Sequence, residues 1–224
     1  MRPSEAKAIG DLLARMDRDE ISPFLNLGSS TAAFRSTQKP HIDRYIFRPL
    51  AERGIEGKHA DIKADEGVDI VGDIYDPATM QRIHEVAPKL VLCCNMFEHV
   101  TDREALARQL DEMLAPGGHL LVTVPYSYPI HYDPIDTYFR PTPDELKALF
   151  PNFTTVEAGI WPDTTYLHDL LAERGPGGTL KHMARSAAKL PMIWRGMHWW
   201  KGHFHRYLWL FRPYKVTAVL LRKG

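Results

Sequence analysis

Cysteine is scarce in this sequence, and long apolar runs are missing. The two cysteines, Cys93 and Cys94, are adjacent within a run that is typical of a buried strand, so a disulfide framework is not expected. No apolar segment approaches the ~18 residues of a membrane-spanning helix. The first residues, 1–7, have no apolar signal core. These absences favour a cytoplasmic protein.

Acidic residues are absent from the last part of the chain. Residues 174–224 contain eleven Lys or Arg and no Asp or Glu, whereas the rest of the chain has 28 acidic and 17 basic residues. Four of the five tryptophans and four of the eleven histidines also lie there: Trp194, Trp199, Trp200, Trp209, His182, His198, His203 and His205. Two interpretations remain open. This tail packs on the acidic body, or its cationic and aromatic groups hold an anionic surface such as lipid headgroups or a phosphorylated substrate.

The length and composition are those of a globular protein. A chain of 224 residues suffices for one well-buried domain with a sizeable insertion. The sequence shows no internal repeat and no low-complexity run. We therefore expect a single domain over residues 1–224, in which residues 162–213 form a basic, aromatic insertion between the last two strands.

The middle of the chain sets the fold class. Residues 90–94 form a short, wholly apolar run, as a strand covered on both faces requires. Thr101 and Glu104 have the spacing of a capping box ahead of a helical pattern, and Pro116 with two glycines ends that helix. Residues 119–124 are a second apolar run. Strand, helix and strand in this order form the unit of doubly wound α/β folds.

The same alternation extends along the chain. The hydrophobic patterns predict further elements as follows: strands at 21–27, 57–62 and 67–74, and helices at 4–16, 41–54 and 77–86. Asp76 and Pro77 are suited to the start of the last of these helices. Thr142 and Glu145 give a second capping box. Two final strands, at 153–161 and 214–222, flank the insertion.

Ligands in folds of this class bind beyond the carboxyl ends of the strands. Gly28, Ser29 and Ser30 follow the first strand, where small residues let backbone N–H groups approach a ligand, although a simple polar turn is the alternative. Asp61 ends the second strand, where a carboxylate can accept hydrogen bonds from both hydroxyls of a ribose. Asp73 ends the third.

These features together resemble the class I S-adenosylmethionine-dependent methyltransferases, in particular the branch with a Leu-Glu-His-Val-like signature after the fourth strand. That signature stands here as Phe97-Glu98-His99-Val100, and residues 114–118 match the family's turn into the fifth strand. The resemblance covers residues 21–222. It implies an α/β, Rossmann-like, doubly wound sheet of seven strands in the order 3-2-1-4-5-7-6, with the last strand antiparallel.

The resemblance also implies roles for particular residues, with S-adenosyl-L-methionine as the cofactor. The first loop would contact the methionine portion, Asp61 the ribose and Asp73 the adenine. The cofactor-binding set that follows is Gly28, Ser29, Ser30, Asp61, Ile62, Asp73, Ile74, Asn95 and Met96. Two departures from the family pattern stand out. Asn26 replaces the usual acidic residue, and Ser30 and Ala32 replace later glycines of the loop.

An alcohol or phenol that accepts a methyl group must also lose its proton, so a base near the methyl group is useful. The segment after the fifth strand holds the candidates by location: His131, Asp133 and Asp136. The same segment supplies the expected acceptor-binding residues: Tyr126, Tyr128, His131, Tyr132, Tyr138 and Arg140. Packing and turn-capping remain the alternative for each of them. Glu98 and His99 are expected to fix their loop, and no metal site is expected, because His203 and His205 have no companion ligand at a suitable spacing.

Two functional hypotheses follow. The first is O-methylation of a saccharide, a lipid-linked glycan or a small metabolite. The second is a non-catalytic binding module of the same fold that contacts an anionic ligand or membrane surface through residues 180–212. A nicotinamide-dependent oxidoreductase is disfavoured by a first loop with a single glycine. A nucleic-acid partner is unlikely on this sequence, since no recognised nucleic-acid module accompanies the basic tail.

Overall fold

The computed structural model describes residues 1–131 and 135–224, and for residues 193 and 198–201 it describes the backbone alone. Its centre is one seven-stranded sheet in the order β3-β2-β1-β4-β5-β7-β6. The strands are β1 (Phe24–Leu27), β2 (Gly57–Asp61), β3 (Ile70–Val71), β4 (Leu90–Cys94), β5 (His119–Ser127), β6 (Phe153–Pro162) and β7 (Lys215–Lys223). The strand order that the resemblance implies is confirmed.

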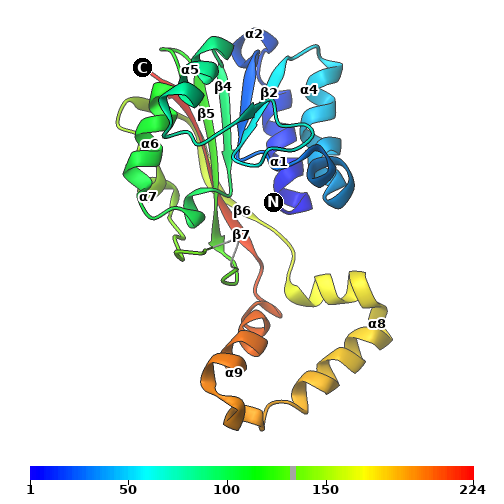
Figure 1. The fold of residues 1–224 in the computed structure, drawn as a ribbon. Coiled ribbons are helices and arrows are strands. Elements are labelled where there is room, and N and C mark those ends of the chain that lie inside the picture. The colour runs from blue at the N-terminus through cyan, green and yellow to red at the C-terminus, as the bar shows by residue number, and fades with distance from the viewer. Residues whose placement is uncertain (132–134) are drawn as a thin grey trace.

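The pairing of the strands brings their carboxyl ends to one edge of the sheet. β1 pairs in parallel with β2 and with β4, and β4 pairs in parallel with β5. β7 runs antiparallel to both β5 and β6. The residues that follow β1, β2, β4 and β5 therefore share the lower edge of the sheet in Figure 1.

Helices cover both faces of the sheet (Figure 1). One face carries α1 (Pro3–Ala14), α3 (Pro40–Ile42), the π-helical turn η2 (Asp43–Phe47) and α4 (Arg48–Glu52); the other carries α5 (Pro77–Val86), α6 (Arg103–Glu112) and α7 (Pro143–Lys147). Alternate residues of β4 enter the two cores: Leu90 and Leu92 pack with α1, whereas Val91 and Cys93 pack with α6. A continuous apolar run is thus what this central strand needs.

Several element boundaries agree with the capping signals. Asp76 accepts a hydrogen bond from the Ala78 amide at the start of α5, and Thr142 with Glu145 forms the predicted capping box of α7. Others differ. The start of α6 is capped by Asp102, whose Oδ1 accepts from the Ala105 amide at 2.8 Å, and not by the predicted Thr101.

Three other predictions need correction. The first strand begins at Phe24, because residues up to Ile21 form a short helix, α2 (Arg18–Ile21). β3 has only two residues, since Gly72 adopts a φ of 156° and packs against Thr79 where the chain turns toward α5. The helix predicted over 41–54 is divided into α3, η2 and α4, and a π-helical turn that the sequence did not indicate, η1 (Phe34–Gln38), precedes it.

Residues 163–214, here called the arm, connect β6 to β7. They contain α8 (Tyr166–Ala187), η4 (Met192–Arg195), α9 (Met197–Phe204) and η5 (His205–Trp209). α8 is broken at Gly175, which has a φ of 65° and precedes a proline. Figure 1 shows the arm, in yellow and orange, projecting from the carboxyl edge of the sheet. Among the described residues, no helix has the length and apolar character needed to cross a membrane.

Candidate active site

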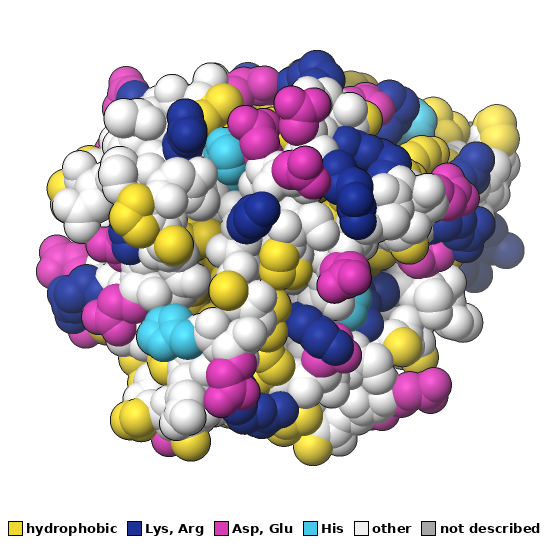
Figure 2. All heavy atoms as spheres, turned by 90° about the horizontal axis from the view of Figure 1, so that it is seen from above, with side chains coloured by type: hydrophobic (Ala, Val, Ile, Leu, Met, Phe, Trp, Pro, Cys, Tyr) yellow, Lys and Arg dark blue, Asp and Glu magenta, His cyan; other side chains and the backbone are white. Residues whose placement is uncertain are grey.

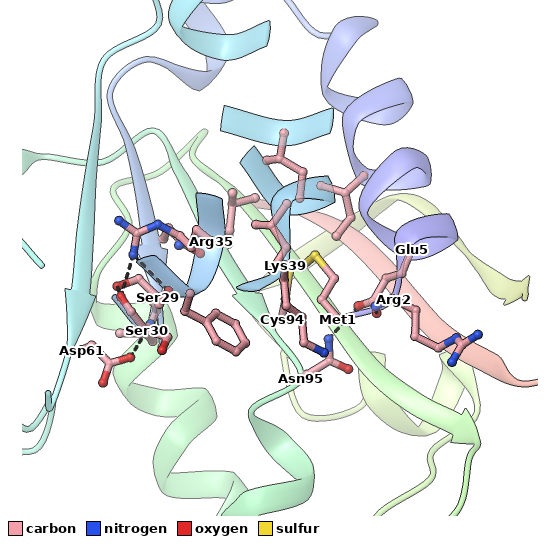
Figure 3. A pocket seen from close by; sticks show the side chains of 18 of the residues that line it. Met1, Arg2, Glu5, Ser29, Ser30, Arg35, Lys39, Asp61, Cys94 and Asn95 are labelled. Carbon is pink, nitrogen blue, oxygen red and sulfur yellow. Dashed lines mark hydrogen bonds between the residues drawn. The ribbon is translucent and has the colours of Figure 1, made fainter. Parts of the chain in front are cut away.

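A cleft opens at the carboxyl edge of the sheet, between the ends of β1, β2 and β4 and the first turn of α1. Its volume is about 430 Å³, within the range of small-molecule sites. Figure 3 shows its two sides: the loop with Ser29 and Ser30 faces Asp61 on one side, and Arg2 and Glu5 lie on the other. The cleft therefore lies where doubly wound sheets bind their ligands.

The loop after β1 is built from backbone contacts. Gly28 has a φ of 66°, and a Cβ atom there would lie 2.8 Å from Cε of Met96, so the position favours glycine. The Ser29 amide donates to the Ala60 carbonyl at 3.1 Å, and the Ser30 amide donates to Oδ2 of Asp61 at 2.6 Å. These two bonds fix the loop beside the end of β2.

Arg35, on η1, joins this loop to the loop after β2. Its guanidinium donates to the carbonyls of Ser29 at 3.1 Å, Ser30 at 2.6 Å and Gly67 at 2.7 Å. The side chain is buried, and burial lowers the pKa of Arg35 from its ordinary value despite the nearby carboxylates. A single buried cation thus contacts both loops, and Figure 3 shows its bonds to the loop with Ser29 and Ser30.

Glu5 attaches α1 to the tips of two strands. Its Oε1 accepts from Nδ2 of Asn95 at 2.8 Å and from Oγ1 of Thr123 at 2.8 Å, and the Glu5 side chain is buried. Asn95 has a φ of 54°, which directs its amide toward α1 rather than along β4. Cys94 lines the cleft beside this contact, and desolvation raises the pKa of its thiol to about 12, so the thiol stays protonated.

His131 lies at the other end of the cleft, beside Tyr128, with ring centroids 5.4 Å apart. Desolvation lowers the pKa of His131, so its imidazole is neutral at neutral pH. Its Nδ1 lies 3.3 Å from Oδ2 of Asp136, which in turn forms an ion pair with Nη2 of Arg140 at 2.6 Å. Although burial alone would raise it, the pKa of Asp136 is held low by that guanidinium and by backbone amides. Asp136 therefore positions His131 and is poorly suited to accept a proton itself.

Glu98 and His99 follow β4 on the 3₁₀ turn η3 (Phe97–His99). The Glu98 side chain has no exposed surface, and burial raises its pKa to about 8. Oε1 of Glu98 lies 3.7 Å from Nε2 of His99, whose Nδ1 lies 2.5 Å from the Ile135 carbonyl oxygen. The His99 and His131 rings meet edge to face with centroids 5.2 Å apart. Glu98 and His99, on the turn after β4, are thus neighbours of His131, which comes from the segment after β5.

Known structures share this architecture. No protein-family model matches the sequence, and no curated protein matches it significantly. A SAM-dependent methyltransferase from Archaeoglobus fulgidus aligns with a TM-score of 0.51 and 15% identity, over 99% of this chain and 95% of that one. YjhP from E. coli aligns with a TM-score of 0.50 and 14% identity, over 100% and 94%. The chain has the class I methyltransferase fold.

A third structure with this methyltransferase fold is phosphoethanolamine N-methyltransferase 2 from Haemonchus contortus, solved with phosphomonomethylethanolamine and S-adenosylhomocysteine. Its TM-score is 0.50 and its identity 13%, over 98% of this chain and 52% of the other, so the present chain spans about half of that enzyme. At identities this low the likeness establishes the fold, and the chemistry must be argued from the cleft.

The methyltransferase fold brings together some of the residues predicted for the site. Those that line the cleft are Gly28, Ser29, Ser30, Asp61, Asn95, Tyr128 and His131. Those that lie outside its lining are Ile62, Asp73, Ile74, Met96, Tyr126, Asp136, Tyr138 and Arg140. Asp73 lies two residues beyond the end of β3, the strand that pairs with β2 near Asp61, and its Oδ1 accepts from the Tyr75 amide at 3.0 Å. Tyr132 and Asp133 fall outside the described residues.

Sequence reasoning missed the charged residues that build the walls of the cleft, namely Arg2, Glu5 and Arg35. Periodicity gave no signal for Arg35, because its partners are backbone carbonyls, of the nearby residues Ser29 and Ser30 and of the distant Gly67. For Glu5 a signal existed. Glu5 lies on the apolar face of an amphipathic helix, and a buried carboxylate needs a polar partner. Because that face packs against the sheet, the partner was to be expected at the end of a strand.

Proposed function

We propose that this protein is an S-adenosyl-L-methionine-dependent methyltransferase whose cofactor binds in the cleft. The observation that carries the proposal is the arrangement at the carboxyl edge, where the Gly28 loop and the Asp61 carboxylate border one cavity of about 430 Å³. Doubly wound sheets bind nucleotides at this edge, and a carboxylate at the end of the second strand accepts from the ribose hydroxyls. The shared fold supports the same reading.

The chain's own residues would align the reactants and exclude water, as a direct displacement requires. The bound cofactor supplies an electrophilic methyl group. Gly28 lets the backbone approach it, and Asn95, held by Glu5, borders the space between the two ends of the cleft. His131 and Tyr128 border the end away from Asp61, where we place the acceptor. A neutral imidazole there favours an acceptor hydroxyl, as in a saccharide, a lipid-linked glycan or a small metabolite.

Calorimetric titration with S-adenosylhomocysteine tests the cofactor assignment. We expect the wild-type protein to bind it, and Asp61→Ala to weaken binding strongly while the circular dichroism spectrum is unchanged. Asp65→Ala is a matched control, because Asp65 is an exposed carboxylate on the same loop that does not line the cleft. Folded wild-type protein that gives no heat with either S-adenosylmethionine or S-adenosylhomocysteine would overturn the proposal.

A second function is favoured by the arm, which would contact an anionic membrane surface. Its exposed apolar side chains include Phe211 and Trp194, which are 76% and 75% exposed, and Leu180, which is 71% exposed. They lie in a segment, residues 174–213, with eight Lys or Arg and no acidic residue. Figure 2 views the opposite end of the molecule, where cationic and anionic side chains are interspersed. Apolar groups within a basic segment are what interfacial membrane binding uses.

Vesicle flotation separates the two functions. We expect binding to vesicles containing phosphatidylserine and none to vesicles of phosphatidylcholine alone. The double variant Trp194→Ser, Phe211→Ser should not float with the vesicles. Arg108→Glu, a charge reversal at an exposed position of α6, should leave flotation unchanged. Flotation without binding of S-adenosylhomocysteine would favour a non-catalytic module. Equal recovery of wild type and the double variant would remove the membrane role.

A further inference from the structure

We propose that Glu98, His99 and His131 bind a divalent metal ion at the acceptor end of the cleft. Each residue offers one ligand atom, and the three atoms lie within 4.8 Å of one another. The carboxylate and the His99 imidazole come from the turn after β4, and His131 comes from the segment after β5. Two neighbouring strand ends thus deliver three ligands to one point.

Glu98 gives the first independent support. Its side chain has no exposed surface, and neither carboxylate oxygen has a hydrogen-bond partner within residues 1–131 and 135–224. A buried carboxyl group without partners is unfavourable unless a proton or a cation neutralises it. The neighbouring imidazole of His99 lies 3.7 Å away, too far for a hydrogen bond. A cation between Glu98 and the two histidines would satisfy the group.

The outer contacts of both histidines give the second support. Metal-binding imidazoles usually engage their other ring nitrogen with a carboxylate or a backbone carbonyl. Nδ1 of His131 lies 3.4 Å from the Pro129 carbonyl oxygen, its hydrogen-bond partner, and 3.3 Å from Oδ2 of Asp136, whereas Nδ1 of His99 lies 2.5 Å from the Ile135 carbonyl oxygen. Both arrangements leave Nε2 as the ligand atom. Arg140 fixes Asp136 in turn, so Asp136 is a positioning residue.

The ligand set indicates the kind of ion. Two imidazoles and one carboxylate suit zinc and the neighbouring divalent transition metals, and three protein ligands leave a coordination position open. Ligand atoms ~2.1 Å from a tetrahedral zinc ion lie ~3.4 Å apart. Since the three atoms are already within 4.8 Å, binding requires only small side-chain adjustments. His99 and His131 both line the cleft, so the open position faces the acceptor space.

This placement also deepens the proposed function, on which the following step rests. An acceptor hydroxyl at the open position would lose its proton to solvent more readily, because the metal stabilises the resulting oxygen anion. An oxygen lone pair then forms the bond to the methyl carbon as the carbon–sulfur bond breaks, and that electron pair remains on sulfur. In this arrangement His131 holds the metal, so the proton goes to solvent and not to His131, which the sequence offers as one of three candidate bases.

Titration of the EDTA-treated protein, residues 1–224, with Co²⁺ tests the site without any turnover. We expect one equivalent to bind with the visible absorption of a low-symmetry, imidazole-bound cobalt ion, and Zn²⁺ to displace it. Glu98→Gln and His131→Gln should each abolish that signal. Asp136→Asn should weaken Co²⁺ binding by ~10–100-fold, as loss of an outer carboxylate does. His168→Gln is the control, because that side chain is exposed on α8.

Each outcome of the titration supports or overturns the metal site. Absence of the signal in the wild type, or its retention in both Glu98→Gln and His131→Gln, would overturn the metal site. His131 is partly exposed, so its variant stays informative if Glu98→Gln does not fold. Binding of S-adenosylhomocysteine, measured in parallel, keeps the two proposals distinct. Cofactor binding without a cobalt signal refutes the metal alone, and a cobalt signal without cofactor binding refutes the methyltransferase alone.

Discussion

Replacement of Arg35 by lysine tests how the cleft is held together. One nitrogen of Arg35 donates to both the Ser29 and the Ser30 carbonyl, and the other donates to Gly67. The single nitrogen of lysine can keep the first pair but loses the bond to Gly67. A hydrogen bond to a charged group contributes about 1.5–3 kcal/mol. Because Gly67 is exposed and water can replace Arg35 as its partner, we expect Arg35→Lys to lower the free energy of unfolding by about 1.5–2 kcal/mol.

A loss of this size lowers the melting temperature by about 3–8 °C in a domain of this length. Thermal unfolding followed by circular dichroism measures that change, and titration with S-adenosylhomocysteine should show weaker binding by up to about tenfold. Arg48→Lys is the matched control, because Arg48 is exposed and its ion pair with Asp43 is worth less than about 1 kcal/mol. Equal melting temperatures and affinities for the Arg35 and Arg48 variants would refute the role of Arg35.

Three further changes test the site and its supports. Gly28→Ala should lower the free energy of unfolding, measured by thermal denaturation, by about 1–2 kcal/mol because φ is positive there. Adding Met96→Ala should restore only the part of this loss that comes from the contact at 2.8 Å. Full restoration would contradict the argument from backbone conformation. Asp61→Asn should raise the dissociation constant of S-adenosylhomocysteine by ~10–100-fold in calorimetry. Burial lowers the pKa of His59 from 6.5 to about 4. Between these two pH values the unfolded chain is protonated at His59 and the folded chain is not, so the free energy of unfolding decreases as the pH falls, by at most ~1.4 kcal/mol per pH unit. His59→Gln should flatten this part of the denaturation profile, and an unchanged slope would exclude His59 as its source.

The strands that lie deepest in the sheet were the most predictable from sequence. β4 coincides with its apolar run, because residues on both of its faces are buried and no polar residue interrupts them. β3 was predicted at four times its real length, since in residues 67–74 only Ile70 and the partly buried Val71 form a strand before the chain turns toward α5. The strand order came from the resemblance and could not be read from periodicity, which carries no information about neighbours.

The residues that line the cleft were predictable where they follow the end of a strand, and unpredictable where tertiary contacts bring them there. Asp61 was found because the carboxyl end of the second strand has a known geometric meaning. Asp136 was grouped with the candidate bases, but an arginine four residues later takes its carboxylate, and only coordinates show that pairing in a segment without helix. The proximity of Glu98 to His131 was equally hidden, because it depends on how two loops meet.

The first turn of α1 links the arm to the cleft through two charged residues. Arg2 donates to Asp163, Thr164 and Asp169 at the base of the arm, and its guanidinium lies 4.4 Å from the Tyr214 ring centroid. Three residues later, Glu5 holds the tip of β4 at the cleft. The contacts of the arm and of the cleft thus converge on the start of α1, through Arg2 at its N-cap and Glu5 in its first turn. The arm and the cleft should accordingly be studied in one intact chain, since each uses α1 as its support.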